Sequence, residues 1–203
     1  MRSRSTVLET AILGLLNSSP LHGYELRKQL GELLGPFRAF SYGSLYPALR
    51  ALQERGLLAG LEQSATPRRT RTASAAATKP TRSRIVYELT LLGRDYLADL
   101  LSSSGPAAWE DENFDVRFAL FGQTDAETRL RILEGRRSRL TERLEAVRQS
   151  AARTRHRLDE YSAELQRHGL DKVEREVRWL DDLITHERAR ETRQPTNPHK
   201  ERG

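Results

Sequence analysis

Through the first part of the chain, apolar residues recur at intervals of three and four, which is the period of helices that bury one face. Thr6 and Glu9 fit a capping box, so we expect a first helix from Thr6 to about Asn17. After a turn at 17–20, the pattern predicts a second helix over residues 23–34, which Gly35-Pro36 ends. The chain therefore begins with two short amphipathic helices.

A third helix is predicted from Ser41 to about Arg55. Its buried face is marked by leucines at helical spacing: Leu45, Leu49 and Leu52. Ser41 is the expected N-cap, because its hydroxyl can accept a hydrogen bond from a first-turn amide, and Gly56 is the expected left-handed stop. Pro47 has no N–H to donate to the carbonyl of Gly43, so we expect the helix to open irregularly or to bend there.

The other face of this third helix carries hydroxyl groups and an arginine: Ser41, Tyr42, Ser44, Tyr46 and Arg50. Such groups suit a helix that enters the major groove of DNA, where they reach base edges and phosphates. An ordinary amphipathic helix with a solvated face has the same pattern, and the residues alone leave both interpretations open. Arg50 is the strongest candidate for a DNA contact. Lys28 is expected to touch the DNA backbone, and Tyr24 to be a core or positioning residue.

Two short strands are predicted next, over residues 57–62 and 85–89, joined by a low-complexity loop at 63–84 that we expect to be mobile. The loop has no acidic residue after position 65. Its basic side chains are candidates for contacts with DNA phosphates: Arg68, Arg69, Arg71, Lys79, Arg82 and Arg84. A basic loop by itself is usually only solvated. Three helices followed by a strand, a basic loop and a strand, however, have the order of a winged helix-turn-helix, in which the hairpin loop reaches phosphates or the minor groove.

From residue 124 the pattern changes to that of long helices. A heptad-like seam continues to Leu165, Gly169 is expected to close that helix, and a second helix is predicted over residues 171–190. Stripes this narrow need each other or a second subunit, so a hairpin within one chain and a homodimer both remain open. The residues predicted to form a dimer contact are Leu140, Leu144, Val147, Leu158, Tyr161, Leu165, Val177, Leu180 and Ile184.

The predicted fold is mainly α with a small β-hairpin. It comprises an N-terminal winged helix-turn-helix domain at residues 1–101, a linker at 102–113, a long-helix dimerisation domain at 114–191 and a disordered tail at 192–203.

Composition agrees with a nucleic-acid partner and gives no sign of an enzyme. The formal net charge is +6, and 31% of the residues are charged. Cysteine is absent and no apolar run reaches membrane-spanning length, so we expect a cytoplasmic protein without a membrane contact. No phosphate-binding glycine loop or nucleophile elbow occurs, and the spacing of Asp182 and His186 is better explained by a solvated helix face than by a metal. We therefore expect no catalysis, cofactor or metal.

The chain also resembles the PadR family of bacterial transcription factors. The resemblance lies in Leu-His-Gly-Tyr-Glu-Leu at 21–26, Gly-Ser-Leu-Tyr-Pro-Ala-Leu at 43–49, Leu-Gln-Glu-Arg-Gly-Leu at 52–57 and Tyr-Glu-Leu-Thr-Leu-Leu-Gly at 87–93. The region 114–184 is similar to the subgroup with a larger helical C-terminal domain, although the loop at 63–84 is longer than is typical of the family.

This resemblance implies a homodimeric repressor that binds double-stranded DNA and responds to a small aromatic or hydrophobic effector held between the winged and helical domains. Aromatic residues that would line such a site are Trp109, Phe114, Phe118, Phe121 and Trp179, which are otherwise explained as core. The rival interpretation is a coiled-coil adaptor whose basic loop binds RNA or acidic proteins.

Overall fold

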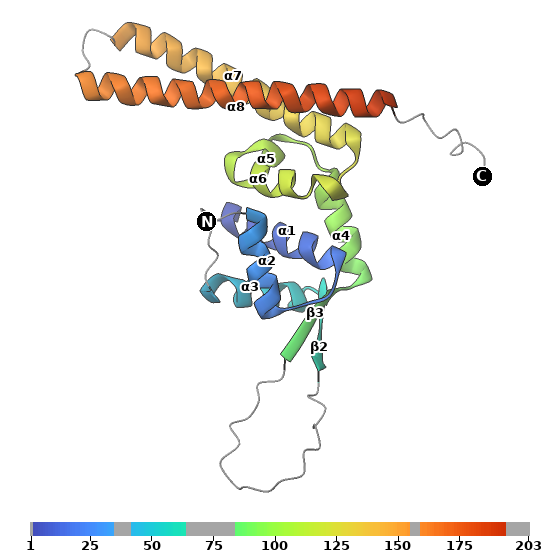
Figure 1. Ribbon diagram of the computed structural model, residues 1–203. Helices are drawn as coiled ribbons and strands as arrows, with labels where there is room; N and C mark the ends of the chain where they lie inside the picture. Colours follow the sequence, from blue (N-terminus) through green and yellow to red (C-terminus); the bar gives the residue numbers. More distant parts are fainter. Residues whose placement is uncertain (1, 35–41, 64–83, 155–158, 194–203) are drawn as a thin grey trace, which may run out of the picture. The chain divides into compact units, whose positions relative to one another are not determined.

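The structure is a computed structural model that describes residues 2–34, 42–63, 84–154 and 159–193 (Figure 1). It divides into two compact units. Residues 1–101 and 118–123 form the first, called here the winged unit, and residues 102–117 and 124–203 form the second, called the helical unit. The predicted fold class is confirmed: the described residues are mainly α-helical with one small antiparallel sheet.

The winged unit contains the predicted helices and strands, close to their predicted bounds. Its elements are α1 (Arg2–Ser18), β1 (Leu21–His22), α2 (Gly23–Leu34), α3 (Tyr42–Glu54), β2 (Leu58–Gln63), β3 (Arg84–Leu89) and most of α4 (Leu91–Ser102). The sheet order is β1-β3-β2, with Leu21 opposite Tyr87 and Leu58 opposite Leu89. The sequence predicted only the β2–β3 hairpin, and the short strand β1 was missed.

Aliphatic side chains from α1 to α4 form the core of this unit. The largest of those that are almost wholly buried are Ile12, Leu13, Leu26, Leu30, Leu45, Leu49, Leu52 and Leu97. Two expectations are wrong here. Thr6 does not cap α1, which begins at Arg2, and the Thr6 carbonyl instead accepts a hydrogen bond from the Thr10 hydroxyl at 2.9 Å. Tyr24 is not a core residue, because it lies 66% exposed on the first turn of α2, where Leu26 points inward instead.

The end of α3 is fixed by glycine and by backbone hydrogen bonds. Gly56 has a φ of +71°, as predicted, and the amides of Gly56 and Leu57 donate back to the carbonyls of Gln53 and Leu52. Pro47 lies inside the helix, which is continuous from Tyr42 to Glu54, so the irregular opening expected near Pro47 does not occur. The alternative expectation, a bend at Pro47, stays a prediction.

The start of α4 is joined to this turn. The Thr90 hydroxyl caps α4 by accepting a hydrogen bond from the Gly93 amide at 3.0 Å, and it donates to the Gly56 carbonyl at 2.7 Å. Gly93 lies so close to the preceding segment that a Cβ there would be 2.1 Å from the Leu57 carbonyl oxygen. Only glycine fits at this crossing.

Residues 118–123 also belong to the winged unit, although they follow a helix that begins in the helical unit. The Leu120 side chain packs against the backbone of α1 at Gly14, where a Cβ would approach it to 2.4 Å. Within the short 3₁₀ helix η1 (Phe121–Gln123), the Gln123 amide donates to the Gly14 carbonyl at 3.0 Å and its oxygen accepts from Asn17. This segment is therefore attached to α1 by both apolar and polar contacts.

The helical unit contains α5 (Pro106–Trp109), most of α6 (Asp111–Ala119), α7 (Ala126–Thr154) and α8 (Glu160–Arg193). The helices α7 and α8 lie side by side as a long hairpin (Figure 1). Residues 102–113, predicted to be a linker, thus include one short helix and the start of another. Helix α8 also continues into the region predicted to be a tail.

Gly169 does not end a helix, contrary to the prediction. Helix α8 runs through Gly169 without interruption, and the break falls earlier, between Thr154 and Glu160. Asp159 marks the new start, because its carboxylate accepts hydrogen bonds from the amide and the hydroxyl of Ser162. A glycine inside a helix costs only about 1 kcal/mol, so it stops a helix only where other signals agree. Leu158 lies outside the described residues.

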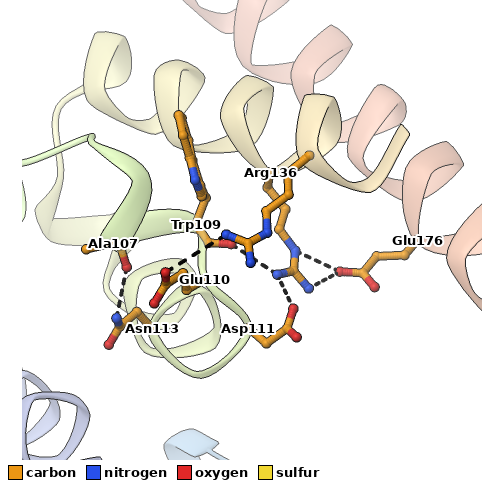
Figure 2. A network of polar contacts seen from close by, with 8 residues as sticks. Ala107, Trp109, Glu110, Asp111, Asn113, Arg136 and Glu176 are labelled. Atoms are coloured by element: carbon orange, nitrogen blue, oxygen red, sulfur yellow. Dashed lines mark hydrogen bonds and ion pairs between the residues drawn. The ribbon is translucent and has the colours of Figure 1, made fainter. Parts of the chain in front are cut away.

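The buried Arg136 joins four helices of the helical unit: it lies on α7 and bonds to the end of α5, the start of α6 and the middle of α8 (Figure 2). Arg136 on α7 is 6% exposed. Its guanidinium donates to Glu176 of α8 at 2.6 Å, to the Trp109 carbonyl at 3.0 Å and to Asp111 at the start of α6. Burial lowers the pKa of Arg136, but the hydrogen bonds to Glu176 and Asp111 outweigh it, so the pKa lies above its usual value.

Candidate nucleic-acid interface

The two faces of α3 differ as the sequence predicted. Leu45, Leu49 and Leu52 are buried, whereas Arg50 is exposed and forms no hydrogen bond or ion pair within the described part of the chain. An arginine presented on a rigid helix without an internal partner is available to an outside anion.

The remaining predicted contacts of α3 are only partly placed by the structure. Ser44 is half-buried, and Tyr46 is 46% exposed. Tyr42 begins the helix, but its side chain and all of Ser41 lie outside the described residues. Of the predicted contact residues beside Arg50, Tyr46 is thus exposed to solvent and Ser44 is partly exposed.

The C-terminal end of α3 is held by an arginine that the sequence did not single out. Arg55 donates to Glu9 of α1 at 2.7 Å, and its guanidinium lies 4.9 Å from the ring centre of Tyr96 on α4. The pKa of Arg55 lies above its usual value, because of hydrogen bonding to Tyr96 first and to Glu9 second. These contacts tie the C-terminal end of α3 to α1 and α4 and thereby hold the helix that carries Arg50.

The middle of α3 contacts the start of α2 through Tyr46. A Cβ on Gly23 would lie 3.2 Å from the Tyr46 hydroxyl oxygen, so the ring occupies the space that the glycine leaves. The pKa of Tyr87 on β3 is raised, mainly by burial and secondly by the neighbouring Tyr46. Tyr46 therefore packs against the start of α2 with one part of its ring, while almost half of the residue remains exposed to solvent.

Helix α2 offers further exposed groups close to its start. Tyr24 and Arg27 are exposed, and Lys28 is exposed with a weak i,i+4 ion pair to Glu32 at 3.7 Å. The sequence singled out Lys28 and predicted Tyr24 to be a core or positioning residue, of which only the core alternative is contradicted by its exposure. The sequence did contain a signal for this exposure, because Tyr24 is two positions before Leu26 and therefore lies on the side of the helix opposite Leu26 and Leu30.

The predicted contacts of the wing cannot be compared with geometry. Arg68, Arg69, Arg71, Lys79 and Arg82 lie outside the described residues. Arg84 begins β3 and pairs with Gln63 in the backbone ladder, but its side chain is likewise outside the description. The described strands place both ends of this basic segment at the same end of the β2–β3 hairpin.

The aromatic residues proposed to line an effector site are found in different settings. Phe114 is buried and meets Trp179 edge to face, with ring centres 6.3 Å apart. Trp109 packs against the backbone of Gly135, where a Cβ would be 1.5 Å from the ring. Phe118 belongs to the winged unit, half-buried, with its ring centre 5.1 Å from that of Phe121. Packing accounts for these contacts without a ligand.

The residues predicted to form a dimer contact fall into two groups. Leu140, Leu144, Leu180 and Ile184 are buried, and Val177 is half-buried, within the single chain. Val147, Tyr161 and Leu165 remain exposed. The predicted dimer contact can therefore use only the exposed group directly.

Among the described helices, none combines the length and the apolar content that a membrane span requires. Nor do three metal-ligating side chains come together within the described ranges.

Comparison with known proteins supports a regulator of transcription. Residues 12–99 match the model of the transcriptional regulator PadR-like family. The negative transcriptional regulator PadR of Bacillus subtilis (strain 168) is 38% identical over 52 residues, which cover 26% of this chain and 29% of that relative. The chain thus spans less than a third of the relative's length.

Solved structures of similar proteins include a PadR-like transcription factor from Bacteroides fragilis. It has 26% identity, a TM-score of 0.39, and covers 58% of this chain and 93% of that one. PadR of B. subtilis in complex with operator DNA has 20% identity and a TM-score of 0.39, and covers 89% of this chain and 99% of that one.

The matched family consists of transcriptional regulators and not of enzymes, which agrees with the expectation of a non-catalytic protein. The match covers the helices and the sheet that present Arg50, and it begins and ends inside the winged unit. Residues 12–99 of this chain are therefore similar to the PadR-like family of transcriptional regulators.

Proposed function

We propose that this protein is a DNA-binding transcriptional repressor that recognises a pseudo-palindromic operator as a homodimer. The observation that carries the proposal is the exposed face of α3, where Arg50 has no partner in the described chain and the helix is held in place by Arg55. The family match supports regulation of transcription, and the name of the B. subtilis relative supports repression.

In this mechanism α3 lies in the major groove. Arg50 contacts a base edge or a phosphate, Ser44 and Tyr46 add hydroxyl groups, and Lys28 contacts the backbone. The basic residues of the wing bind phosphates and make the affinity dependent on salt. Two subunits would place two α3 helices about 34 Å apart, one turn of the double helix, so that each reads one half-site.

The first test isolates Arg50. DNA fragments selected by the purified protein are sequenced to define the operator, and binding is measured by fluorescence anisotropy. Arg50→Ala is expected to weaken operator binding about 10- to 100-fold without changing the melting temperature, because it removes one strong contact of an exposed side chain. Arg94→Ala, which removes an exposed arginine of α4 in the same unit, is the matched control and should retain the wild-type affinity.

The second test separates a regulator from an adaptor that binds RNA or acidic proteins. A regulator prefers its operator to a scrambled duplex and to RNA of the same length, and its affinity falls steeply with salt. Replacing Arg68 and Arg69 by Ala should reduce the salt slope by about 2 and weaken all duplexes alike. Equal affinity for operator, scrambled duplex and RNA would contradict the proposed function.

We also propose that a small aromatic or hydrophobic effector releases the operator. Trp179 is the more exposed of the two tryptophans, so its fluorescence in the Trp109→Phe variant provides a direct probe. Aromatic acids and apolar ring compounds are titrated first into the free protein and then into the operator complex. An effector should change the emission and release the DNA at matching concentrations, whereas a compound that changes neither is not one.

A further inference from the structure

Four residues spaced by four form a continuous row on the surface of α8: Tyr161, Leu165, Gly169 and Val173. Tyr161 is 87% exposed and Leu165 is 72% exposed, although both are large and apolar. Gly169 interrupts the row, and a Cβ built there would meet no atom within 4 Å. The row therefore presents two projecting side chains followed by a gap.

The gap opens into a groove between α7 and α8 with a volume of about 170 Å³. Its lining is mainly apolar and consists of Arg143, Leu144, Val147, Gln166, Gly169, Leu170 and Val173. A cavity of about 150 Å³ holds a benzene-sized group, so this groove has room for one leucine side chain. The exposed Leu165 therefore lies one helical turn before Gly169, which lines the groove.

We propose that a second copy of this chain fills the groove. An interface about a two-fold axis is self-complementary, so each projecting side chain of one copy must meet a gap of the other. Antiparallel α8 helices that cross midway between Leu165 and Gly169 satisfy this condition twice, because Leu165 of each copy then lies against the partner's Gly169. A parallel pair instead places Leu165 against Leu165 and leaves both gaps empty.

The charges beside the row fit the same arrangement. Arg136, Arg137 and Arg148 of α7 each pair with a carboxylate of α8, but Arg143 at the groove forms no hydrogen bond or ion pair within the described residues. Glu160, exposed at the start of α8, is likewise without such a partner in the described part of the chain. Antiparallel pairing brings Glu160 of one copy towards the groove of the other, whereas parallel pairing brings Glu160 towards Glu160.

This inference rests on the homodimer of the proposed function and specifies its contact. The first experiment measures the dissociation constant of the dimer by sedimentation. Leu165→Ala removes the projecting side chain and Gly169→Leu fills the gap, so each should weaken the dimer about 10- to 100-fold. Asp171→Leu adds the same side chain at an exposed position on another face of α8 and should leave the dimer unchanged. Circular dichroism checks that each variant keeps its helices.

The double variant Leu165→Ala with Gly169→Leu exchanges the projecting side chain and the gap. Leu at position 169 then enters the space left at position 165 of the other copy, so the double variant should dimerise at least 10-fold more tightly than either single variant. A mere loss of apolar surface or of helix stability cannot produce this recovery. A double variant as weak as the single ones would overturn the proposal.

Cross-linking tests the direction of the pair, because the chain has no cysteine of its own. Under oxidation, a mixture of Leu165→Cys chains with Gly169→Cys chains should yield disulfide-linked dimers, whereas Leu165→Cys chains alone should not. Efficient linking of Leu165→Cys chains alone would indicate a parallel pair and refute the arrangement. A wild-type monomer would refute it too, while operator binding, measured separately, decides the proposed DNA contact.

Discussion

In the winged unit, α1, α2 and α3 pack together through leucine and isoleucine side chains. The ion pair between Glu9 and Arg55 links α1 to the end of α3. In the helical unit, α7 and α8 share a narrower apolar seam, which is flanked along its length by arginine–carboxylate pairs. These pairs are Arg129–Glu187, Arg136–Glu176, Arg137–Asp181, Arg148–Glu174 and Arg188–Glu134. One unit is thus held mainly by burial, and the other by burial together with charge.

The difference follows from geometry. Short helices crossing around one centre enclose aliphatic side chains on several sides, whereas two long helices cover only one stripe of each other. The long polar flanks of such a pair are placed in register by ion pairs, most of which are exposed and individually weak. Changes of shape should therefore damage the winged unit most, and changes of charge should damage the helical unit most at the buried Arg136, which bridges several helices.

The largest expected effect comes from Gly93. Gly93→Ala places a Cβ 2.1 Å from the Leu57 carbonyl oxygen and 2.9 Å from the Leu89 side chain, and the backbone of Leu57 cannot move aside as a flexible side chain could. We expect a loss of about 3 kcal/mol in the free energy of unfolding, measured by urea denaturation. Hydrogen exchange should show the loss in peptides of the winged unit.

Gly31→Ala is the matched control, because a Cβ on Gly31 in α2 meets nothing within 4 Å. It should stabilise the protein by about 0.5–1 kcal/mol through lower backbone freedom in the unfolded state. Equal effects of the two substitutions would mean that close packing does not govern the winged unit.

The second effect concerns Arg136. Arg136→Ala leaves Glu176, the Trp109 carbonyl and Asp111 without their shared donor, and we expect a loss of about 2–3 kcal/mol. Arg137→Ala breaks the neighbouring pair with Asp181, in which both side chains are about half exposed, and should cost at most about 1 kcal/mol. Hydrogen exchange in α7 and α8 measures both. Similar losses would remove the distinction between buried and exposed charge.

Predictability from sequence follows the same division. In the winged unit most boundaries have their own chemical signal, such as Gly56 after α3 or Thr90 before α4, and α2, α3 and the two hairpin strands were predicted to within a residue or two. The start of α1 is the exception, because the helix begins at Arg2 and not at Thr6. The strand β1 was missed because two residues have no period. Its existence depends on β3, more than sixty positions away in the chain, which pairs Leu21 with Tyr87.

In the helical unit the sequence predicted long amphipathic helices but placed their boundary wrongly. The apolar period continues across the break after Thr154, so it could not reveal that Leu133 and Leu165 lie on different helices. No local pattern indicated the burial of Arg136, because its partners come from distant segments. At the candidate DNA interface, Arg50 was predicted from its face of the helix, but the role of Arg55 depends on Glu9 and Tyr96, which no local pattern indicates.

A third effect tests how the helical unit is held at its ends. Asp125 caps α7 by accepting a hydrogen bond from the Thr128 amide at 2.8 Å, and this bond is the main reason that the pKa of Asp125 lies below its usual value. Asp125→Ala should cost about 1 kcal/mol of unfolding free energy. Asp182→Ala removes an exposed carboxylate in the middle of α8 and should be close to neutral. A loss of the same size in both variants would attribute the effect to net charge and not to the cap.

The smallest effect is a pH dependence centred on Asp111. Its pKa is lowered from the usual 3.8, mainly by the hydrogen bond from Arg136, so the unfolded state takes up a proton more readily than the folded state. The contribution of Asp111 is therefore complete above pH 3.8 and is lost as the pH falls from there through the lowered value. Because the carboxylate is 68% exposed, solvent screens it and the loss should be smaller than that caused by any variant above.

Urea midpoints measured between pH 5 and 3 provide this test, since they compare wild type with Asp111→Asn under identical conditions. The variant should lose less stability on acidification, while Asp182→Asn should follow the wild type. The Asp111 effect should disappear in the Arg136→Ala background, because without the guanidinium the carboxylate has no reason to prefer its charged form in the folded state. If Asp111→Asn changes the pH dependence equally in both backgrounds, the lowered pKa does not come from Arg136, and the buried arginine is held by Glu176 and the Trp109 carbonyl alone.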